Sequence, residues 1–389
     1  MLLKLLMVSS VPSTLTAFLL PYAEHFRRLG WRVDALTRDG SGCERCLNTF
    51  DNVWDVAWSR NPLKPQNLLE APQTIHELIA RQGYDIVHVH DPVAAFVTRF
   101  ALRRLEHPQV FYTAHGFHFF KGNHLLKNAL FLTLERLAGR WTDHLIVINR
   151  EDEAAAKRYR LVPEGQLHYL PGIGVDTAAY SAAQVTAEEV EAVRASLGLR
   201  GEDPLFLLVA EFNPGKRHRD ALRALAKLPH PRAALAFAGV GPLLEATKQL
   251  ASELGIAERV HFLGYRHDIP VLLRAASALL LPSEREGLPR SIMEAMAMGT
   301  PVIATPIRGV SELLAESCGL LHPVGDVDEL ARAMAWIIAN PHEAGALAER
   351  AKVRVARYDL KPLLAAHEVL YQQALTRSQT SAMFKDSIP

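Results

Sequence analysis

Short apolar runs alternate with longer, helix-like stretches along nearly the whole chain. This alternation is typical of α/β proteins, in which helices connect the strands of a parallel sheet. The amphipathic stretches 18–29 and 123–140 are examples of the predicted connecting helices. The sequence therefore predicts an α/β fold built from doubly wound sheets. The strands predicted in the first half are Leu3–Val8, Arg32–Leu36, Ile86–Val89, Val110–Thr113, Leu145–Ile148 and Leu167–Leu170.

The same pattern starts again in the second half of the chain. Strands are predicted at LFLLVA from Leu205, AALAFAG from Ala233, VHFLG from Val260, SALLLP from Ser277 and PVIAT from Pro301. The polar stretch 181–200 contributes no strand, so we expect the linker in or just before it. A chain of 389 residues is also long for a single core.

These observations predict two doubly wound domains, at 1–180 and 200–358, that face each other across a cleft. A C-terminal helix at about 360–377 could pack back on the first domain. Ligands of such sheets bind beyond the carboxyl ends of the strands.

Composition excludes several classes of protein. Hydrophobic content of 49% and charged content of 22% fit a globular protein, and a net charge of +1 argues against a nucleic-acid binder. No apolar run reaches the roughly 18 residues that span a bilayer. The opening MLLKLLMVSS is interpreted as a buried strand rather than an export signal, so we expect the chain in the cytoplasm.

The three cysteines give only a weak signal. Cys43 and Cys46 form a lone C-x-x-C, and Cys318 is distant in sequence. A structural zinc site needs four ligands, so we expect reduced cysteines rather than a metal or redox site.

The segment 277–305 reads as strand, loop, helix and strand, with the helix predicted to begin near Leu288–Pro289. Gly287 lets the backbone approach a ligand, and the free N–H groups of a helix start suit a diphosphate. Glu286 and Glu294 are eight residues apart, so both can face one side. They could bind sugar and ribose hydroxyls. An isolated pair at this spacing is more often explained by a carboxylate that favours a helix start.

The pair is not isolated, because EGLPRSIMEAMAMGTPVIAT resembles the E-x7-E signature of the family 4 retaining glycosyltransferases. FAGVGPLLEATKQLASELGI, VHFLGYRHDIPVLLRAASALLLPS and GVSELLAESCGLLHPVGD around it are similar to that family as well. In the first half, YDIVHVHDP, FYTAHGFHFFKG, LIVINREDEAAAK and YLPGIGVD resemble its bacterial branch for capsule, exopolysaccharide and lipid-linked glycans. The resemblance covers about residues 1–330 and implies the GT-B fold, which has two Rossmann-like domains.

The resemblance also implies roles for the segment after the strand at Ser277. Glu286 is expected to contact the donor sugar, and Glu294 the ribose. The backbone N–H groups of Gly287, Leu288 and Arg290 are expected to hold the diphosphate.

A second donor-binding group follows the strand at Leu205. Lys216 matches the lysine that family members place against the donor phosphates, where its charge stabilises the leaving diphosphate without a metal. Many members carry an Arg where this chain has Glu211, and Arg217 could replace it. The alternative is that Lys216 and Arg217 only decorate a loop.

Two further segments are assigned to the nucleotide pocket by the resemblance. FAGVGPL places Gly239 in the pocket wall, but it lacks the third glycine of a dinucleotide fingerprint. YRHDIP places Arg266 near the base.

The acceptor side is assigned to the first half. His115 follows a predicted strand and is the strongest candidate for a positioning group or proton relay at the reacting hydroxyl, with His118 second. Thr14 and Thr16 lie in a first loop that we expect near the phosphates or the acceptor. His88 and His90 are expected to point to opposite faces of one strand, and at least one of them to be a core or sheet-end histidine.

These expectations combine into one predicted reaction. A hexose or N-acetylhexosamine would move from a nucleotide-diphosphate donor, expected to be UDP-linked, to a lipid-linked saccharide, with retention and without a metal or cofactor. The alternatives are a nucleotide-sugar epimerase or a phosphorylase of the same architecture, and a non-catalytic binding subunit of a glycan-assembly complex.

The stretch 99–160 bears on the lipid-linked acceptor. It holds eleven Lys or Arg against six Asp or Glu. A peripheral contact with an anionic membrane and an ordinary packing helix are equally compatible with it.

Overall fold

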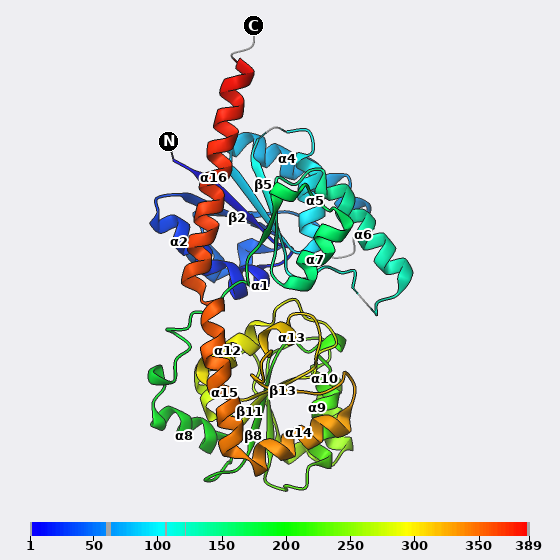
Figure 1. Ribbon diagram of the computed structural model, residues 1–389, viewed down its shortest axis with the longest axis vertical. Helices are drawn as coiled ribbons and strands as arrows, with labels where there is room; N and C mark the ends of the chain where they lie inside the picture. The colour runs from blue at the N-terminus through cyan, green and yellow to red at the C-terminus, as the bar shows by residue number, and fades with distance from the viewer. Residues whose placement is uncertain (1, 60–63, 106, 121, 387–389) are drawn as a thin grey trace. The chain divides into compact units, whose positions relative to one another are not determined.

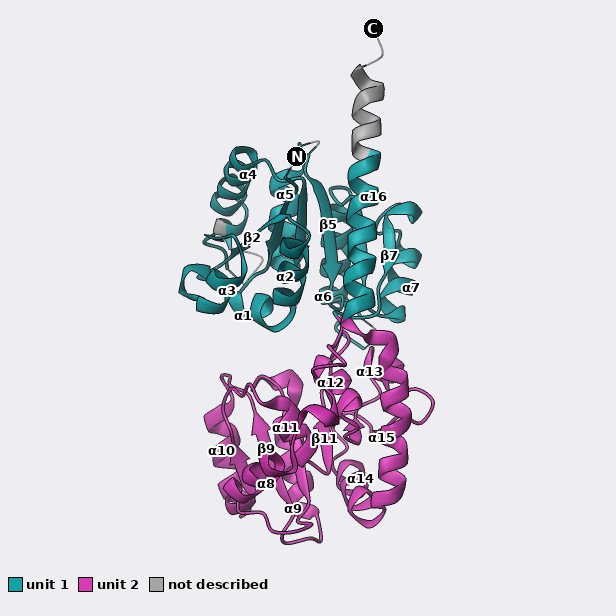
Figure 2. Cartoon of the chain, turned by 90° about the vertical axis from the view of Figure 1, so that its left-hand side faces the viewer, with its two compact units in different colours: residues 1–173, 361–389 teal, residues 174–360 magenta. Residues whose placement is uncertain are grey.

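The computed structural model describes residues 2–59, 64–105, 107–120 and 122–386 (Figure 1). The chain forms two compact units, which are residues 1–173 with 361–389 and residues 174–360 (Figure 2). The boundary between the units falls between residues 173 and 174, just before the polar stretch 181–200, which belongs to unit 2. Helix α8 (Ala187–Ser196) is anchored there by Arg194, which donates to the carbonyls of Ala275 and Asp203 at 2.9 and 2.8 Å.

Unit 1 is built on a parallel sheet with the strand order β3-β2-β1-β4-β5-β6-β7. The six predicted strands are present within a residue or so of their expected bounds. The seventh, β3, was missed because NVWD has no apolar run and lies on the sheet edge. The strands are β1 (Lys4–Val8), β2 (Arg32–Thr37), β3 (Asn52–Asp55), β4 (Ile86–His90), β5 (Gln109–Ala114), β6 (His144–Val147) and β7 (Leu167–Tyr169).

Helices cover both faces of this sheet. The C-terminal helix α16 (Leu360–Asp386) lies along one face in both views (Figures 1 and 2). Its fully buried Tyr371 ring lies 5.0 Å from Phe26 and 4.8 Å from Phe111, which ties the last helix to the first sheet. The other helices are α1 (Pro12–Thr14), η1 (Leu15–Leu19), α2 (Leu20–Arg28), α3 (Glu44–Thr49), α4 (Glu70–Gln82), α5 (Pro92–Leu102), α6 (Leu125–Gly139) and α7 (Arg150–Tyr159), with short turns of helix at η2 (Gly40–Gly42), η3 (Pro65–Asn67) and η4 (Glu164–Gln166).

Unit 2 repeats the architecture with a parallel sheet in the order β10-β9-β8-β11-β12-β13. The five predicted strands are present, and the two-residue edge strand β13 was too short to recognise. The strands are β8 (Leu205–Val209), β9 (Ala234–Ala238), β10 (Val260–Phe262), β11 (Ala278–Leu281), β12 (Val302–Ala304) and β13 (Leu320–Leu321). The helices after α8 are η6 (Pro214–Lys216), α9 (His218–Lys227), α10 (Leu244–Glu253), η7 (Ala257–Arg259), α11 (Ile269–Ala275), α12 (Arg290–Met298), α13 (Val310–Leu313), α14 (Val327–Ala339), α15 (Pro341–Val355) and η8 (Ala356–Tyr358).

In each sheet, the loops after neighbouring strands come together at one edge. Because its strands are parallel, their carboxyl ends meet at the same edge, and the loops that follow neighbouring strands lie side by side. In unit 1 the central neighbours are β1, β4 and β5, and in unit 2 they are β9, β8 and β11.

Cys43 and Cys46 are joined in a disulfide at the start of α3. The expectation of two reduced thiols is therefore wrong. Cys43 caps the short helix, and the helical turn brings Cys46 back to within bonding range of it. Cys318 in unit 2 is a buried free thiol.

Candidate functional site

The loops after β8 and β11 come together at the carboxyl edge of unit 2. These strands pair in parallel, with Phe206 opposite Ala278. The backbone N–H of Glu284 donates to the carbonyl of Gly215 at 2.9 Å. The hydrogen bond fastens the loop that carries Lys216 to the loop that carries Glu286.

Lys216 and Glu286 form an ion pair at this junction. The Lys216 Nζ lies 2.6 Å from the Glu286 Oε1, and their side chains are 25% and 10% exposed. The Asn213 side chain accepts from the Lys216 N–H at 3.2 Å and so fixes the turn of η6. The structure thus brings two predicted site residues into direct contact, with a cation and a carboxylate facing the same edge.

Arg217 stands next to Lys216 but contacts carboxylates. It adopts a left-handed conformation with φ of 54°, and its Nε lies 2.5 Å from Asp220. Its Nη1 lies 3.6 Å from Glu284. Glu211 is exposed and accepts from the Asn213 amide at 3.1 Å. Arg217 therefore adds a second cation to the loop, held by acidic neighbours.

Helix α12 begins at Arg290, just after the predicted start. Pro289 is its N-cap and provides no side-chain cap for the first-turn amides. Glu294 is 6% exposed and lies 2.8 Å from the Arg290 Nε. The Tyr180 hydroxyl also hydrogen-bonds to Glu294, and burial raises the pKa of this carboxyl. Tyr180 comes from a stretch assigned to the first domain from the sequence, which gave no signal of the contact.

Glycines shape the loops at this edge. A Cβ on Gly309 would lie 1.8 Å from the Gly287 carbonyl oxygen, so the loop after β12 packs directly on the backbone next to Glu286. The side chain of Leu288 is buried. A Cβ on Gly239 would lie 2.0 Å from the Ala210 carbonyl oxygen. Gly239 therefore allows the loops after β8 and β9 to touch.

Arg266 lies in the loop after β10, beside the loop of Gly239. The Gly239 N–H donates to the Gly264 carbonyl at 2.7 Å, and the Arg266 Nε lies 2.7 Å from the Asp268 Oδ1. Tyr265, between Gly264 and Arg266 in the sequence, is 60% exposed. Arg308 also belongs to this edge, although no sequence motif pointed to it, and its Nε donates to the Glu286 carbonyl at 3.4 Å.

The carboxyl edge of unit 1 carries His115. Its Nε2 lies 3.0 Å from the Nδ1 of His90, which ends the neighbouring strand β4. The ring of Phe18 on η1 stacks 6.2 Å away. Burial lowers the pKa of His115, and the nearby Asp91 carboxylate opposes that shift.

The other acceptor-side candidates lie around this edge. The His118 ring lies 5.2 Å from the ring of Phe131 on α6. The Thr16 hydroxyl donates to the Ser13 carbonyl at 3.3 Å. Thr14 ends α1, so the predicted first loop is the start of a helix.

His88 and His90 share one face of β4. Their ring centroids are 4.2 Å apart, so the expectation of opposite faces is wrong. Side chains two residues apart on a strand point the same way. Both rings are buried, at 1% and 3% exposure.

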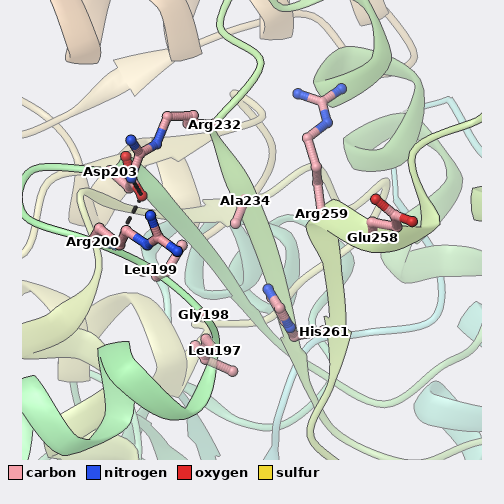
Figure 3. Close-up of a pocket in the computed structure, with 10 residues that line it drawn as sticks. All are labelled: Leu197, Gly198, Leu199, Arg200, Asp203, Arg232, Ala234, Glu258, Arg259 and His261. Carbon is pink, nitrogen blue, oxygen red and sulfur yellow. Dashed lines mark hydrogen bonds and ion pairs between the residues drawn. The ribbon is translucent and has the colours of Figure 1, made fainter.

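A cavity of about 340 Å³ lies at the opposite edge of the unit 2 sheet, near the amino ends of β8, β9 and β10 (Figure 3). Two of its arginines are already engaged, since Arg232 pairs with Asp203 at 2.5 Å and Arg259 donates to backbone carbonyls. It contains no predicted site residue.

Two family models match the chain, each over most of one unit. The model described as glycosyl transferase 4-like domain matches residues 14–172, and that of glycosyl transferases group 1 matches residues 189–354. The chain is 33% identical over 360 residues to EpsD of Bacillus subtilis, a protein named as a putative glycosyltransferase. The match covers 91% of this chain and 92% of EpsD. The chain belongs to the family 4 GT-B glycosyltransferases.

Other members extend the comparison. This glycosyltransferase is 28% identical over 267 residues to an Escherichia coli enzyme named UDP-Gal:alpha-D-GlcNAc-diphosphoundecaprenol alpha-1,3-galactosyltransferase, covering 67% of this chain and 68% of that one. Its fold matches HepE of Anabaena, solved with UDP and glucose, with a TM-score of 0.78 and 22% identity over 95% of this chain and all of HepE.

In the described part of this glycosyltransferase, no helix combines the length and the apolarity needed to cross a membrane. Within the same residues, His, Cys, Asp and Glu side chains nowhere gather in a group of three that could hold a metal ion.

Proposed function

We propose that this glycosyltransferase moves a hexose or N-acetylhexosamine from a UDP-sugar to a lipid-linked saccharide, with retention of the anomeric configuration and without a metal. The observation that carries the proposal is the Lys216–Glu286 pair at the carboxyl edge of unit 2, beside the start of α12. The name of the E. coli relative, a UDP-galactose transferase acting on a diphosphoundecaprenol-linked sugar, supports the choice of donor and acceptor classes.

Cleavage of the sugar–phosphate bond develops negative charge on the leaving UDP. The Lys216 ammonium and the first-turn amides of α12, from Arg290 on, stabilise that charge. Glu286 accepts hydrogen bonds from the donor sugar, and Glu294 from the ribose. These roles require no metal ion.

The acceptor side is assigned to unit 1. His115 is partly exposed and lies at the carboxyl edge of β5, where it can hydrogen-bond a sugar oxygen.

Contact with an anionic membrane is part of the same proposal. Helix α6 buries only Ala138 and Gly139, while Leu125, Leu126 and Leu130 are 83%, 75% and 43% exposed. Exposed Lys127, Arg136 and Arg140 lie on the same helix or directly after it. Exposed leucines together with basic residues suit the headgroup region of an anionic bilayer at the inner face of the cell membrane, where a lipid-linked acceptor is presented.

The decisive experiment mixes the purified chain with single UDP-sugars and an undecaprenyl-diphosphate-linked N-acetylglucosamine, with and without a chelator. We expect a disaccharide whose anomeric coupling, measured by NMR, matches that of the donor. An inverted product would contradict the proposal, as would loss of turnover with the chelator. Isomerisation of a UDP-sugar without acceptor would indicate an epimerase, and donor binding without turnover would indicate a binding subunit.

Vesicle sedimentation tests the membrane part. We expect the chain to bind phosphatidylglycerol vesicles and not phosphatidylcholine vesicles, and Leu126→Gln with Leu130→Gln to abolish binding. The matched control is Val353→Gln, an exposed apolar residue of unit 2 at 78% exposure. Equal binding of wild type and the leucine variant would exclude α6 as the contact.

A further inference from the structure

A line of buried histidines stands behind His115 in unit 1. The His90 Nδ1 lies 3.0 Å from the His115 Nε2, and the His88 ring stacks on His90 at 4.2 Å. Burial lowers the pKa of all three, so the line is neutral at neutral pH. One proton therefore lies between the His90 Nδ1 and the His115 Nε2. The nitrogen that carries it decides which of the two histidines is the hydrogen-bond donor.

His88, the histidine farthest from His115 in this line, has a hydrogen-bond partner on each ring nitrogen. The hydroxyl of the buried Tyr371 hydrogen-bonds to the His88 Nδ1, and the His88 Nε2 lies 2.7 Å from the Thr113 Oγ1. A buried phenol O–H needs an acceptor, so the His88 Nδ1 accepts and its Nε2–H donates to Thr113. His88 is thus a core residue that fixes the face against which His90 packs.

His90 has one nitrogen without a partner. Its Nε2 is buried, and the described residues provide no hydrogen bond to it. If Nε2 carried the proton, an N–H group would be orphaned in the core, which folded proteins avoid more strongly than an under-satisfied acceptor. The proton therefore sits on Nδ1, and His90 donates to the His115 Nε2.

The consequence falls on His115. With its Nε2 accepting, neutral His115 carries its own proton on Nδ1. His115 is partly exposed, and its one hydrogen bond to a described residue is the contact with His90. The Nδ1–H is thus the group that remains for a ligand.

We propose that His90 is a positioning residue that locks His115 as a hydrogen-bond donor toward an oxygen of the bound sugar or phosphate. In this tautomer His115 has no free lone pair with which to take a proton from the acceptor hydroxyl. His115 therefore binds and orients, and is not the general base. The effect on turnover rests on the proposed function, whereas the tautomer does not.

The tautomer is measured directly from the ¹⁵N chemical shifts of ¹⁵N-histidine-labelled full-length chain at pH 7.5, with the His115 signals assigned from His115→Asn. We expect a protonated Nδ1 and an unprotonated Nε2. The opposite assignment would overturn the proposal, and it can be made even if the chain shows no transferase activity.

Variants at position 90 connect the tautomer to turnover. In His90→Asp the carboxylate accepts from His115, which moves a proton to Nε2, and we expect kcat/KM to fall by about tenfold or more. His90→Asn keeps an N–H near the Nδ1 position and should retain the wild-type His115 shifts and most activity. Wild-type activity in a His90→Asp variant whose His115 shifts have inverted would overturn the role in turnover.

The chain provides a matched control pair. His144 and His168 have the same geometry, with Nδ1 to Nε2 at 3.0 Å and ring centroids 5.2 Å apart, as for His90 and His115. They lie on β6 and β7, with His144 at the amino end of its strand. We expect His144→Asp to leave kcat/KM within about twofold of wild type. An equal loss in both variants would mean that a buried carboxylate in unit 1, rather than the tautomer of His115, lowers activity.

Discussion

The carboxyl edges of the two sheets have the same architecture, but the residues that meet there are charged in unit 2 and neutral in unit 1. In unit 2 the loops after neighbouring strands meet through an ion pair of 2.6 Å between Lys216 and Glu286. In unit 1 they meet through a contact of 3.0 Å between two histidines, His90 and His115, whose pKa values are lowered by burial. At one edge the residues that meet are a cation and a carboxylate, and at the other they are two histidines that burial keeps neutral.

The difference matches what each edge is proposed to bind. A departing nucleoside diphosphate gains negative charge, so a cation beside its phosphates contributes to the rate. A sugar hydroxyl carries no charge, and neutral hydrogen-bonding groups suffice to orient it. Two similar sheets therefore acquire different chemistry through the few residues that follow their strands.

The largest effect is expected at the charged edge. Lys216→Ala removes the cation that stabilises the leaving group, so kcat should fall by about 10²–10³-fold. Steady-state kinetics with the UDP-sugar measure this. The control is Lys227→Ala, which removes an exposed lysine that pairs with Asp328 in the same unit. A loss of the same size in both variants would refute a special role for Lys216.

A backbone change at the same edge should have a somewhat smaller effect. In Gly309→Ala the new Cβ would lie 1.8 Å from the Gly287 carbonyl oxygen, which displaces the loop that carries Glu286. We expect kcat/KM to fall by about 10²-fold or less.

The matched control for Gly309 separates displacement from backbone strain. Gly255 has a similar positive φ of 67°, compared with 75° at Gly309, but nothing lies within 4 Å of its Cβ position. Gly255→Ala should cost stability in a thermal melt and leave kcat/KM unchanged. If both variants lose equal activity, strain alone explains the loss.

The sequence predicted most strands and the main candidate residues, but not all of the contacts between these residues at the two edges. Apolar runs predicted the central strands, and the edge rule with the family resemblance placed Lys216 and Glu286 together. The Tyr180–Glu294 hydrogen bond was not predictable, because Tyr180 lies in a stretch with no strand pattern. The His90–His115 contact depends on the register of β4 against β5, which pairs His90 with Thr113. Strand periodicity does not specify that register.

The buried histidines of unit 1 predict a graded response to acid. Burial lowers the pKa of His367 and of His144 in unit 1 to about 4, against about 6.5 for an unfolded histidine. Between these values the unfolded chain binds more protons, so the free energy of unfolding decreases as the pH falls from about 6.5 to about 4. In unit 2, His218 behaves in the same way. Unit 1 carries more such histidines and should lose more stability.

Hydrogen exchange measured by mass spectrometry at pH 7 and pH 5 resolves the two units. We expect protection to decrease more in the core strands β4 and β5 than in β8 and β11. His367→Gln removes one titrating group and should reduce the pH dependence in unit 1 alone. Greater acid sensitivity of the unit 2 core would contradict the conclusion that buried histidines make unit 1 the more acid-sensitive unit.

The smallest effect is expected from removing the disulfide between Cys43 and Cys46 in unit 1. The bond closes a short loop at the carboxyl side of β2, with a sequence separation of three. Loop-closure entropy for so short a loop amounts to at most about 2 kcal/mol. Cys43→Ser with Cys46→Ser should therefore lower the melting temperature of unit 1 by a few degrees and leave unit 2 and its nucleotide binding unchanged. Calorimetry of the double variant, with and without UDP, tests this: a UDP affinity that drops with the disulfide would show that the two edges are coupled.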